Sequence, residues 1–512
     1  MKRFNKILAL CLCCLVLSST LIACGHKPVN SISGDGKGQV VMTYITMLTE
    51  PADMAMVEEA ISKKLNDQLG ITVDFYPLSI LEQSKYTTII GGGERLDLMC
   101  VSFTDPTEFA NVGMIKKLTE EDIRTYAPDI AAMAEAGNSP YIYDTKGNII
   151  GINTIEVQNG YGGSYVVRKS DLEAIGLADK YPDQTRVSYE DLDLIFAKLK
   201  EKFPDSYPSG NMSDVSSKFS AMDGAGSSLG RSYGVLNLEA DATSTKLVNY
   251  YETAEYKEYL THMQDWFSKG YVYPDALTSS DNNISLFASG KFRGTYLDCW
   301  PMLRDEYVTR CGEPVVQLQL MDPYEVPIAA GTGICWCICG TAQNPAAALR
   351  LLNQMMIDQE LMNTFQWGIE GTHYEFVDKE AGVIDFPEGL DASTSGFYNT
   401  LGLYGDKSKI YTFLAPGQTV EDVKDSNALM LQLCEKAKEK RVPVTGFYWD
   451  SSNVTAEIAA VDNVIAQYAG SIGIGQNKKY DEFIAALKDA GIDKIIADKQ
   501  AQLDAYLAAN KK

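Results

Sequence analysis

The stretch from Val326 to Glu375 constrains the fold of this chain most strongly. Within it, the apolar run Ile334 to Ile338 is short, dense and flanked by glycines, as expected of a buried strand. Asn344 and Pro345 then start a helix, because asparagine is a favourable N-cap and proline is tolerated at the first helical position. Apolar residues that follow at helical spacing predict a buried face: Leu351, Leu352, Met355 and Met356.

A second predicted helix, Gln359 to Phe365, leads into a segment with little periodicity, Trp367 to Tyr374. Trp367 offers an aromatic plane, and Glu370 offers a carboxylate in the same loop. Sugar rings stack on aromatic planes, while their hydroxyls need acceptors such as carboxylates. The segment is therefore a predicted ligand contact, with packing inside the fold as the alternative for Trp367.

Upstream of this stretch, predicted strands alternate with predicted helices. The strands are Val40 to Met47, Ile71 to Tyr76 and Leu96 to Val101. This alternation indicates β-α-β units and a parallel sheet. Ligands of such sheets collect beyond the carboxyl ends of the strands. The segments Leu48–Asp53 and Ser102–Asp105 occupy those ends and predict ligand contacts at Glu50, Phe103 and Asp105.

Local signals also define individual helix starts and a hairpin. Thr119 with Asp122 three residues later predicts a capped helix over 117–126. Ser188 predicts the cap of an amphipathic helix over 188–201, and the segment Tyr141–Ile152, with Gly-Asn at its middle, predicts a hairpin.

The strand, the N-P-A-A-A-L-R-L-L-N-Q-M-M helix and the W-G-I-E-G-T-H-Y-E segment resemble the extracellular solute-binding proteins of ABC importers. W-F-S-K-G-Y-V-Y-P at 266–274, followed by F-A-S-G-K-F at 287–292, looks like the second lobe of the sugar-binding members. The chain is similar to a family 1-like branch of long lipoproteins with an extra C-terminal region of the DUF3502 type. The ending over 490–510 resembles that added region.

This resemblance implies a two-lobed α/β fold of the periplasmic-binding-protein type, with a cleft between the lobes and a helical C-terminal addition over their junction. The first lobe would begin with 40–155, and the second would comprise mainly 156–330. A return crossing with hinge-proximal helices would occupy 331–375, and 376–512 would complete the lobes.

The same resemblance, together with aromatic residues placed at loop and element ends, suggests further ligand contacts. Tyr161 lies where the chain would first cross between lobes, and Trp300 follows the predicted strand Phe292–Leu297, in the position of a sugar platform. Near the C-terminus, aromatic and acidic residues gather at Tyr448, Trp449 and Asp450. For each aromatic residue the alternative is packing at the junction between the lobes.

The amino terminus predicts export and anchoring. Basic residues precede the apolar run Ile7–Leu17, which is typical of a signal peptide and too short to span a bilayer. Leu21 to Gly25 then looks like a bacterial lipobox. It predicts a signal over 1–23, lipidation of Cys24, a flexible tether over 24–39 and attachment to the outer face of the cell membrane. The alternatives are an ordinary cleaved signal and a short anchor.

Net charge and cysteine content argue against nucleic-acid binding, a complete disulfide framework and a cysteine metal site. The net charge of −23 opposes binding to nucleic acid, which selects basic surfaces. The body after Cys24 holds an odd number of cysteines, which argues against a complete disulfide framework. Cys335, Cys337 and Cys339 alternate along one strand face as apolar side chains, and no metal site is predicted there. A bridge between Cys299 and Cys311 is left open.

No catalytic motif is present: the chain lacks H-E-x-x-H, G-x-S-x-G and a phosphate loop. We therefore expect no enzymatic activity, cofactor or metal, and ATP hydrolysis would come from another subunit. The resemblance above, together with the aromatic residues at loop and element ends, implies a monomeric binding protein that carries a solute, foremost an oligosaccharide, to ABC permease subunits. The alternatives are a peptide or amino-acid carrier, a surface glycan-degrading enzyme with two facing carboxylates, and a structural surface lipoprotein.

Overall fold

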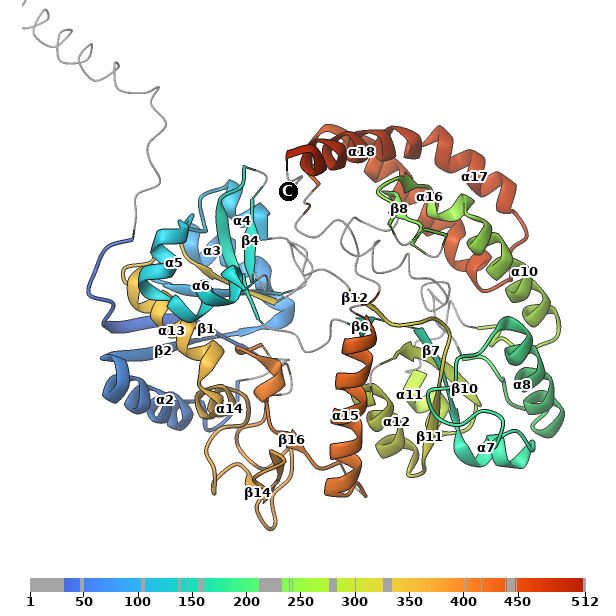
Figure 1. The fold of residues 1–512 in the computed structure, drawn as a ribbon, viewed down its shortest axis with the longest axis horizontal. Helices are drawn as coiled ribbons and strands as arrows, with labels where there is room; N and C mark the ends of the chain where they lie inside the picture. Colours follow the sequence, from blue (N-terminus) through green and yellow to red (C-terminus); the bar gives the residue numbers. More distant parts are fainter. Residues whose placement is uncertain are drawn as a thin grey trace, which may run out of the picture.

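The structure is a computed structural model, shown as a ribbon in Figure 1. It describes residues 32–46, 50–102, 106–136, 140–144, 146–154, 160–161, 163–210, 233–238, 240–241, 243–275, 283–299, 301–325, 334–399, 401, 403–415, 417–437, 439, 447 and 449–509.

A six-stranded sheet forms the centre of the first lobe, in the order β2-β1-β3-β13-β5-β4. Its strands are β1 (Gly38–Thr46), β2 (Ile71–Ser79), β3 (Leu98–Ser102), β4 (Tyr141–Tyr143), β5 (Ile149–Asn153) and β13 (Ile334–Ile338). The predicted parallel arrangement is confirmed for β1, β2 and β3. The rest of the sheet is antiparallel: β4 and β5 form the predicted hairpin, and β13 returns from the second lobe and runs antiparallel to both neighbours.

Helices cover this sheet on both faces. They are α2 (Met54–Leu69), α3 (Tyr86–Gly91), α4 (Pro106–Asn111), α5 (Glu120–Tyr126), α6 (Pro128–Glu135), α13 (Pro345–Ile357) and α14 (Gln359–Trp367). The predicted apolar face of α13 is confirmed, because Leu351, Leu352, Met355 and Met356 are all fully buried in the first-lobe core. The capping box of Thr119 and Asp122 at the start of α5 is also confirmed.

The start of α13 differs from the prediction. Asn344 occupies the N-cap position, but its side chain makes no capping hydrogen bond and instead donates to the Lys37 carbonyl at 2.6 Å. The buried Asp97 carboxylate lies beside this helix start, where its Oδ1 accepts from the backbone N–H groups of Gln343 (2.6 Å) and Asn344 (2.9 Å), just before the first residue of α13. A carboxylate is a stronger acceptor than an amide, and it also complements the positive end of the helix dipole.

The last part of the predicted flexible tether is docked on the first lobe. Ile32 is 8% exposed, and its N–H donates to Asp122 Oδ1 at 2.7 Å. The hydroxyl of Tyr126 donates to the Gly34 carbonyl, and Arg350 donates to the Gly36 carbonyl at 2.6 Å. The prediction of a flexible segment is therefore wrong for residues 32–37, because side chains of α5 and α13 satisfy its backbone groups.

The second lobe has a three-stranded antiparallel sheet, β10-β7-β11. Its strands are β7 (Gly163–Arg168), β10 (Gly294–Asp298) and β11 (Val315–Gln319). The surrounding helices are α7 (Lys169–Ala174), α8 (Tyr189–Lys202), α10 (Ala254–Ser268), α11 (Asn283–Ala288) and α12 (Pro301–Cys311). Ser188 caps α8 as predicted.

Two short strands lie between the lobes. β6 (Gly160–Tyr161) pairs with β12 (Tyr324–Glu325), and α15 (Val420–Ala437) packs against this ribbon and against α12. β6 precedes the second-lobe strand β7 and β12 follows β11, so their pairing joins the chain where it enters and where it leaves the second lobe (Figure 1).

Helices from the end of the chain pack on the second lobe. They are α16 (Thr455–Gly473), α17 (Tyr480–Asp489) and α18 (Ile492–Ala509). Val461, Phe483, Leu487 and Ile495 are fully buried in the second-lobe core. In Figure 1 the carboxyl end of α18 reaches back toward the first lobe. Within the described part of the chain, no helix combines the length and apolar character needed to cross a bilayer.

The cysteine predictions have clear outcomes. The Sγ atoms of Cys335 and Cys337 lie 3.7 Å apart on one face of β13, whereas Cys339 lies just beyond the strand. Cys299 and Cys311 are both free thiols, so the bridge left open between them is not formed. Among the described residues, no group of three or more histidine, cysteine or acidic side chains is arranged to hold a metal ion.

Asp97 generates a stability prediction. Replacing it by alanine leaves the N–H groups of Val41, Gln343 and Asn344 without their acceptor and removes the partner of Arg95. We expect Asp97→Ala to lower the free energy of unfolding by about 3–5 kcal/mol. Urea unfolding followed by tryptophan fluorescence measures the change. The exposed Asp67→Ala on α2 is the control and should change stability little; equal effects would contradict the role of Asp97.

Candidate ligand-binding site

Strand pairing identifies which edge of the first-lobe sheet faces the second lobe. Ile334, the first residue of β13 after the return passage, pairs with Ser102 at the carboxyl end of β3. Asn153, the last residue of β5 before the outward passage, pairs with Cys335. Because β1 is parallel to β3, the loop after β1 lies at this same inter-lobe edge. The candidate site is therefore this edge and the second-lobe surface opposite it.

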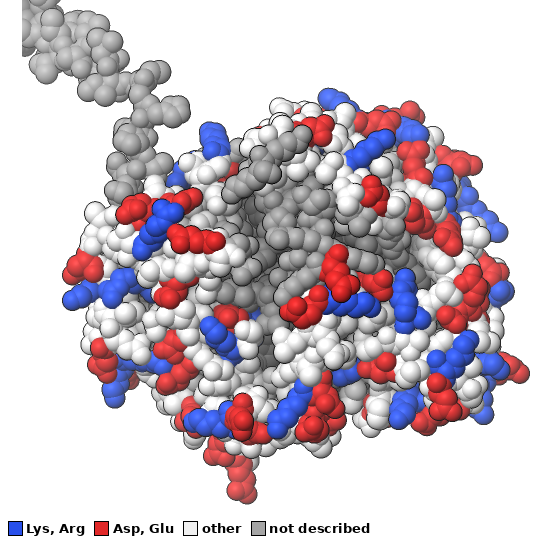
Figure 2. Space-filling view, viewed as in Figure 1, with Lys and Arg blue, Asp and Glu red and all other residues white. Residues whose placement is uncertain are grey.

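Figure 2 shows that this face of the molecule is hollowed between the two lobes. Charged side chains of both signs are interspersed over the described surface around the hollow, without a large area of one sign (Figure 2).

Asp53 and His373 meet at the inter-lobe edge. Asp53 precedes α2 and has a side chain that is 37% exposed, whereas His373 is fully buried. His373 Nε2 lies 3.4 Å from Asp53 Oδ2, and His373 Nδ1 accepts from the Ile369 N–H at 2.9 Å. Since Nδ1 is the acceptor, the proton of the neutral imidazole lies on Nε2, the ring nitrogen near Asp53. Burial lowers the pKa of His373, and the nearby Asp53 opposes that shift in part.

Asn153 carries an unsatisfied amide at the same edge. Its side chain is 2% exposed, and among the described residues neither Oδ1 nor Nδ2 has a hydrogen-bond partner. Leaving a buried donor or acceptor unpaired costs about 1–3 kcal/mol, so such groups in native proteins concentrate at functional sites. Sequence reasoning missed Asn153, because an asparagine that ends a strand has no local signature of binding.

Trp367 and Glu370, predicted to act together, point to different environments. Trp367 is 8% exposed: it stacks on Tyr398 with ring centroids 5.3 Å apart and donates from Nε1 to the Tyr411 carbonyl. Glu370 is exposed, with its carboxylate 3.5 Å from Lys379 Nζ. A ligand could stack on Trp367 only if this aromatic packing opened, so the structure supports the packing alternative.

Trp449 is held from two sides at the surface of the second lobe. Its Nε1 donates to Asp498 Oδ2 at 3.0 Å, and Lys499 Nζ lies 4.4 Å from its ring centroid. Asp450 caps the short helical turn Ser451–Val454, and its backbone N–H donates to Gln502 at 2.9 Å. Trp449 is half-buried and rigidly oriented, as an aromatic platform must be, whereas Asp450 has a structural role.

The remaining predicted contacts divide into two groups. Glu50 is exposed in the loop after β1. Tyr161 contributes its backbone to β6. The predictions that lie outside the described residues are Cys24, Phe103, Asp105, Trp300 and Tyr448.

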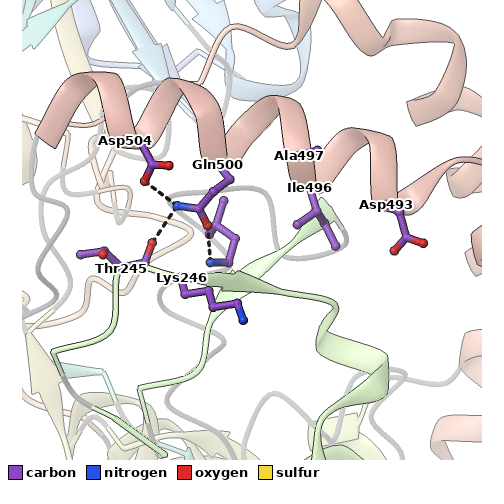
Figure 3. A pocket seen from close by; sticks show the side chains of 8 residues that line it. Thr245, Lys246, Asp493, Ile496, Ala497, Gln500 and Asp504 are labelled. Carbon is purple, nitrogen blue, oxygen red and sulfur yellow. Dashed lines mark hydrogen bonds between the residues drawn. The ribbon is translucent and has the colours of Figure 1, made fainter. Parts of the chain in front are cut away.

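A cavity of about 460 Å³ lies between α18 and the strand β9 (Leu247–Val248), as Figure 3 shows. Its principal polar side chain, Gln500, accepts from the Leu247 N–H and donates to the Thr245 carbonyl and to Asp504. These bonds join α18 to the strand. Because the amide of Gln500 is fully engaged, the cavity is a seam between packed elements and not the candidate site.

Comparisons with known proteins place the fold. A family model described as a domain of unknown function, DUF3502, matches residues 443–508. A carbohydrate ABC transporter substrate-binding protein of Streptococcus pneumoniae is 24% identical over 541 residues, which cover all of both chains. The fold is therefore that of extracellular solute-binding proteins of carbohydrate ABC importers, as the resemblance predicted.

Two solved structures illustrate the likeness. The N-glycan transport solute-binding protein NgtS of S. pneumoniae has a TM-score of 0.73 at 20% identity, covering 93% of this chain and all of NgtS. An extracellular solute-binding protein of Bifidobacterium longum subsp. infantis has a TM-score of 0.63 at 15% identity, with coverage of 93% and 100%. NgtS was also solved in complex with Man5GlcNAc.

The buried Lys499 generates a pH prediction. Burial lowers the pKa of Lys499 to about 7, whereas the unfolded chain keeps the ordinary lysine value near 10.5. Between these values the unfolded state binds the extra proton, so Lys499 makes the free energy of unfolding rise with pH, by up to about 1.4 kcal/mol per unit. We expect Lys499→Met to remove this rise between about pH 7 and pH 9, as measured by urea unfolding.

The exposed Lys478→Met serves as the control, because it makes the same chemical change without altering a buried group. If wild type and Lys499→Met kept the same slope of stability against pH, Lys499 would not be the titrating group.

Proposed function

We propose that this protein binds an oligosaccharide between its lobes and delivers it to the permease subunits of an ABC importer. The observation that carries the proposal is the similarity to a carbohydrate ABC transporter substrate-binding protein over the full length of both chains. NgtS, which shares the fold, was solved with Man5GlcNAc, and FusA, a substrate-binding protein of similar fold, was solved with fructo-nystose. Binding and delivery require no catalytic group in this chain.

The geometry supports a hinged carrier. β6 and β12 pair where the chain enters and leaves the second lobe, so bending at this one short ribbon can move the lobes relative to each other. Ligand favours closure because the closed form adds second-lobe contacts to those of the first-lobe edge. We expect the carrier to act as a monomer.

Thermal unfolding of the soluble chain from Gly25 onward tests the ligand class. The panel comprises mannose-containing N-glycan fragments, fructo-oligosaccharides, peptides and amino acids. A ligand that binds only the native state stabilises it by RT ln(1 + [L]/Kd), about 2.7 kcal/mol at a hundredfold excess over Kd. We expect one oligosaccharide series to raise the melting temperature and to be recovered intact. Stabilisation by peptides alone, or recovery of cleaved sugar, would overturn the proposal.

We further propose that Cys24 is lipidated and anchors the protein to the outer face of the cell membrane. The support is the lipobox-like sequence at residues 21–25. In cells, Cys24→Ala should abolish incorporation of labelled fatty acid and shift the protein from the membrane fraction. Cys11→Ala, within the predicted signal, should leave both unchanged. Retention of label in Cys24→Ala would show that another residue is modified.

A further inference from the structure

Asp53 is an aspartate at a helix N-cap that does not cap. An N-cap aspartate ordinarily accepts a hydrogen bond from the first turn, which stabilises the helix. The Asp53 side chain makes no such bond with α2. Its carboxylate instead turns toward the buried imidazole of His373, with 3.4 Å between Oδ2 and Nε2. The contribution of the cap is thus given up for a different orientation of the carboxylate.

His373 presents its Nε2 to that carboxylate. Its Nδ1 already accepts from the Ile369 N–H, so the proton of the neutral ring lies on Nε2, 3.4 Å from Asp53 Oδ2. This separation does not amount to a regular hydrogen bond, and among the described residues Nε2 has no hydrogen-bond partner. Because burial disfavours the imidazolium form, His373 acts at neutral pH as a dipole and leaves the negative charge of Asp53 in place.

The third participant is the backbone at Gly396. The Asp53 N–H donates to the Gly396 carbonyl at 3.0 Å. A Cβ atom on Gly396 would lie 2.0 Å from Asp53 Oδ2, and the φ angle of Gly396 is +80°. Only glycine leaves room for the carboxylate in this position. Three segments that are distant in sequence therefore converge to orient one half-exposed acid.

We propose that Asp53 is a ligand-recognising carboxylate of the first lobe and that His373 is its positioning residue. The inference rests on the proposed function and deepens it. Asp53 lies at the inter-lobe edge, and a carboxylate offers about four acceptor sites, most of which His373 leaves free. Adjacent hydroxyl groups of a sugar ring are donors that match this arrangement.

The charge at Asp53 also selects among sugars. Within the described residues no lysine or arginine forms an ion pair with Asp53. Its negative charge would therefore repel a uronate or sialate placed against it. The ligand at this position is an uncharged, hydroxyl-bearing sugar and not an acidic one.

The first test compares Asp53→Asn with the wild-type chain by calorimetric titration with Man5GlcNAc, or with the neutral glycan of the panel that stabilises the wild type. We expect affinity to fall about tenfold to hundredfold, because bonds to a charged acceptor are replaced by bonds to an amide. Asp67→Asn, an exposed acid farther along α2, is the matched control and should bind normally. Wild-type affinity in Asp53→Asn would overturn the inference.

A matched pair of variants tests His373. Glutamine places its Nε2 near the imidazole Nε2 and retains the donor to Asp53, whereas asparagine places its Oδ1 near Nδ1 and retains only the acceptor for Ile369. We expect His373→Gln to keep most of the ligand affinity and His373→Asn to bind the ligand severalfold more weakly. This order of affinity should hold whichever variant has the higher melting temperature. If affinity simply followed melting temperature, His373 would be structural only.

Ligand charge supplies a further readout. We expect the wild type to bind the neutral glycan and to reject an oligoalginate, and Asp53→Asn to reduce that discrimination. Absence of oligosaccharide binding by the wild type would refute the proposed function itself. Binding by the wild type with unchanged discrimination in Asp53→Asn would refute only the role of Asp53.

Discussion

The buried carboxylate of Asp97 joins parts of the first lobe that are distant in sequence. It accepts from the N–H of Val41 in β1, from Arg95 and from the backbone N–H groups of the two residues that precede α13. The chain reaches α13 only after it has formed the second lobe and returned. A fully buried acid is stable only when such donors surround it, so Asp97 requires the returning segment to take this position.

The two edges of the first-lobe sheet therefore differ in whether their buried polar groups have hydrogen-bond partners. One edge is formed at the amino end of β3, where Asp97 lies. There the carboxylate of Asp97 and backbone groups of the docked residues 32–37 form hydrogen bonds. At the opposite, inter-lobe edge, the amide of Asn153 and the Nε2 of His373 lack ordinary partners. Pairing at one edge holds the strands and α13 together, whereas the inter-lobe edge keeps buried polar groups unsatisfied, which in a native structure indicates a functional constraint.

Much of the fold was predictable because its signals are local. The strand Ile334–Ile338, the capping boxes at Thr119 and Ser188 and the buried face of α13 all appear as predicted. Errors arose where distant residues compete with local preferences. Asn344 was predicted to cap its own helix, but its side-chain amide donates to the distant Lys37 carbonyl and its backbone N–H donates to Asp97. The tether was predicted from glycine and serine content, but Arg350 and Asp122 bind its backbone.

The sequence by itself determined the export signal pattern, most helices and strands, and the solute-binding class, since each depends on residue types within short windows. The tertiary structure alone decided which polar groups meet. Trp367 and Glu370 are neighbours in sequence, yet one is buried among aromatic side chains and the other is exposed. Asp53 and His373 are separated by most of the chain, yet they are in contact. Burial and electrostatic pairing depend on distance in space, which residue spacing does not specify.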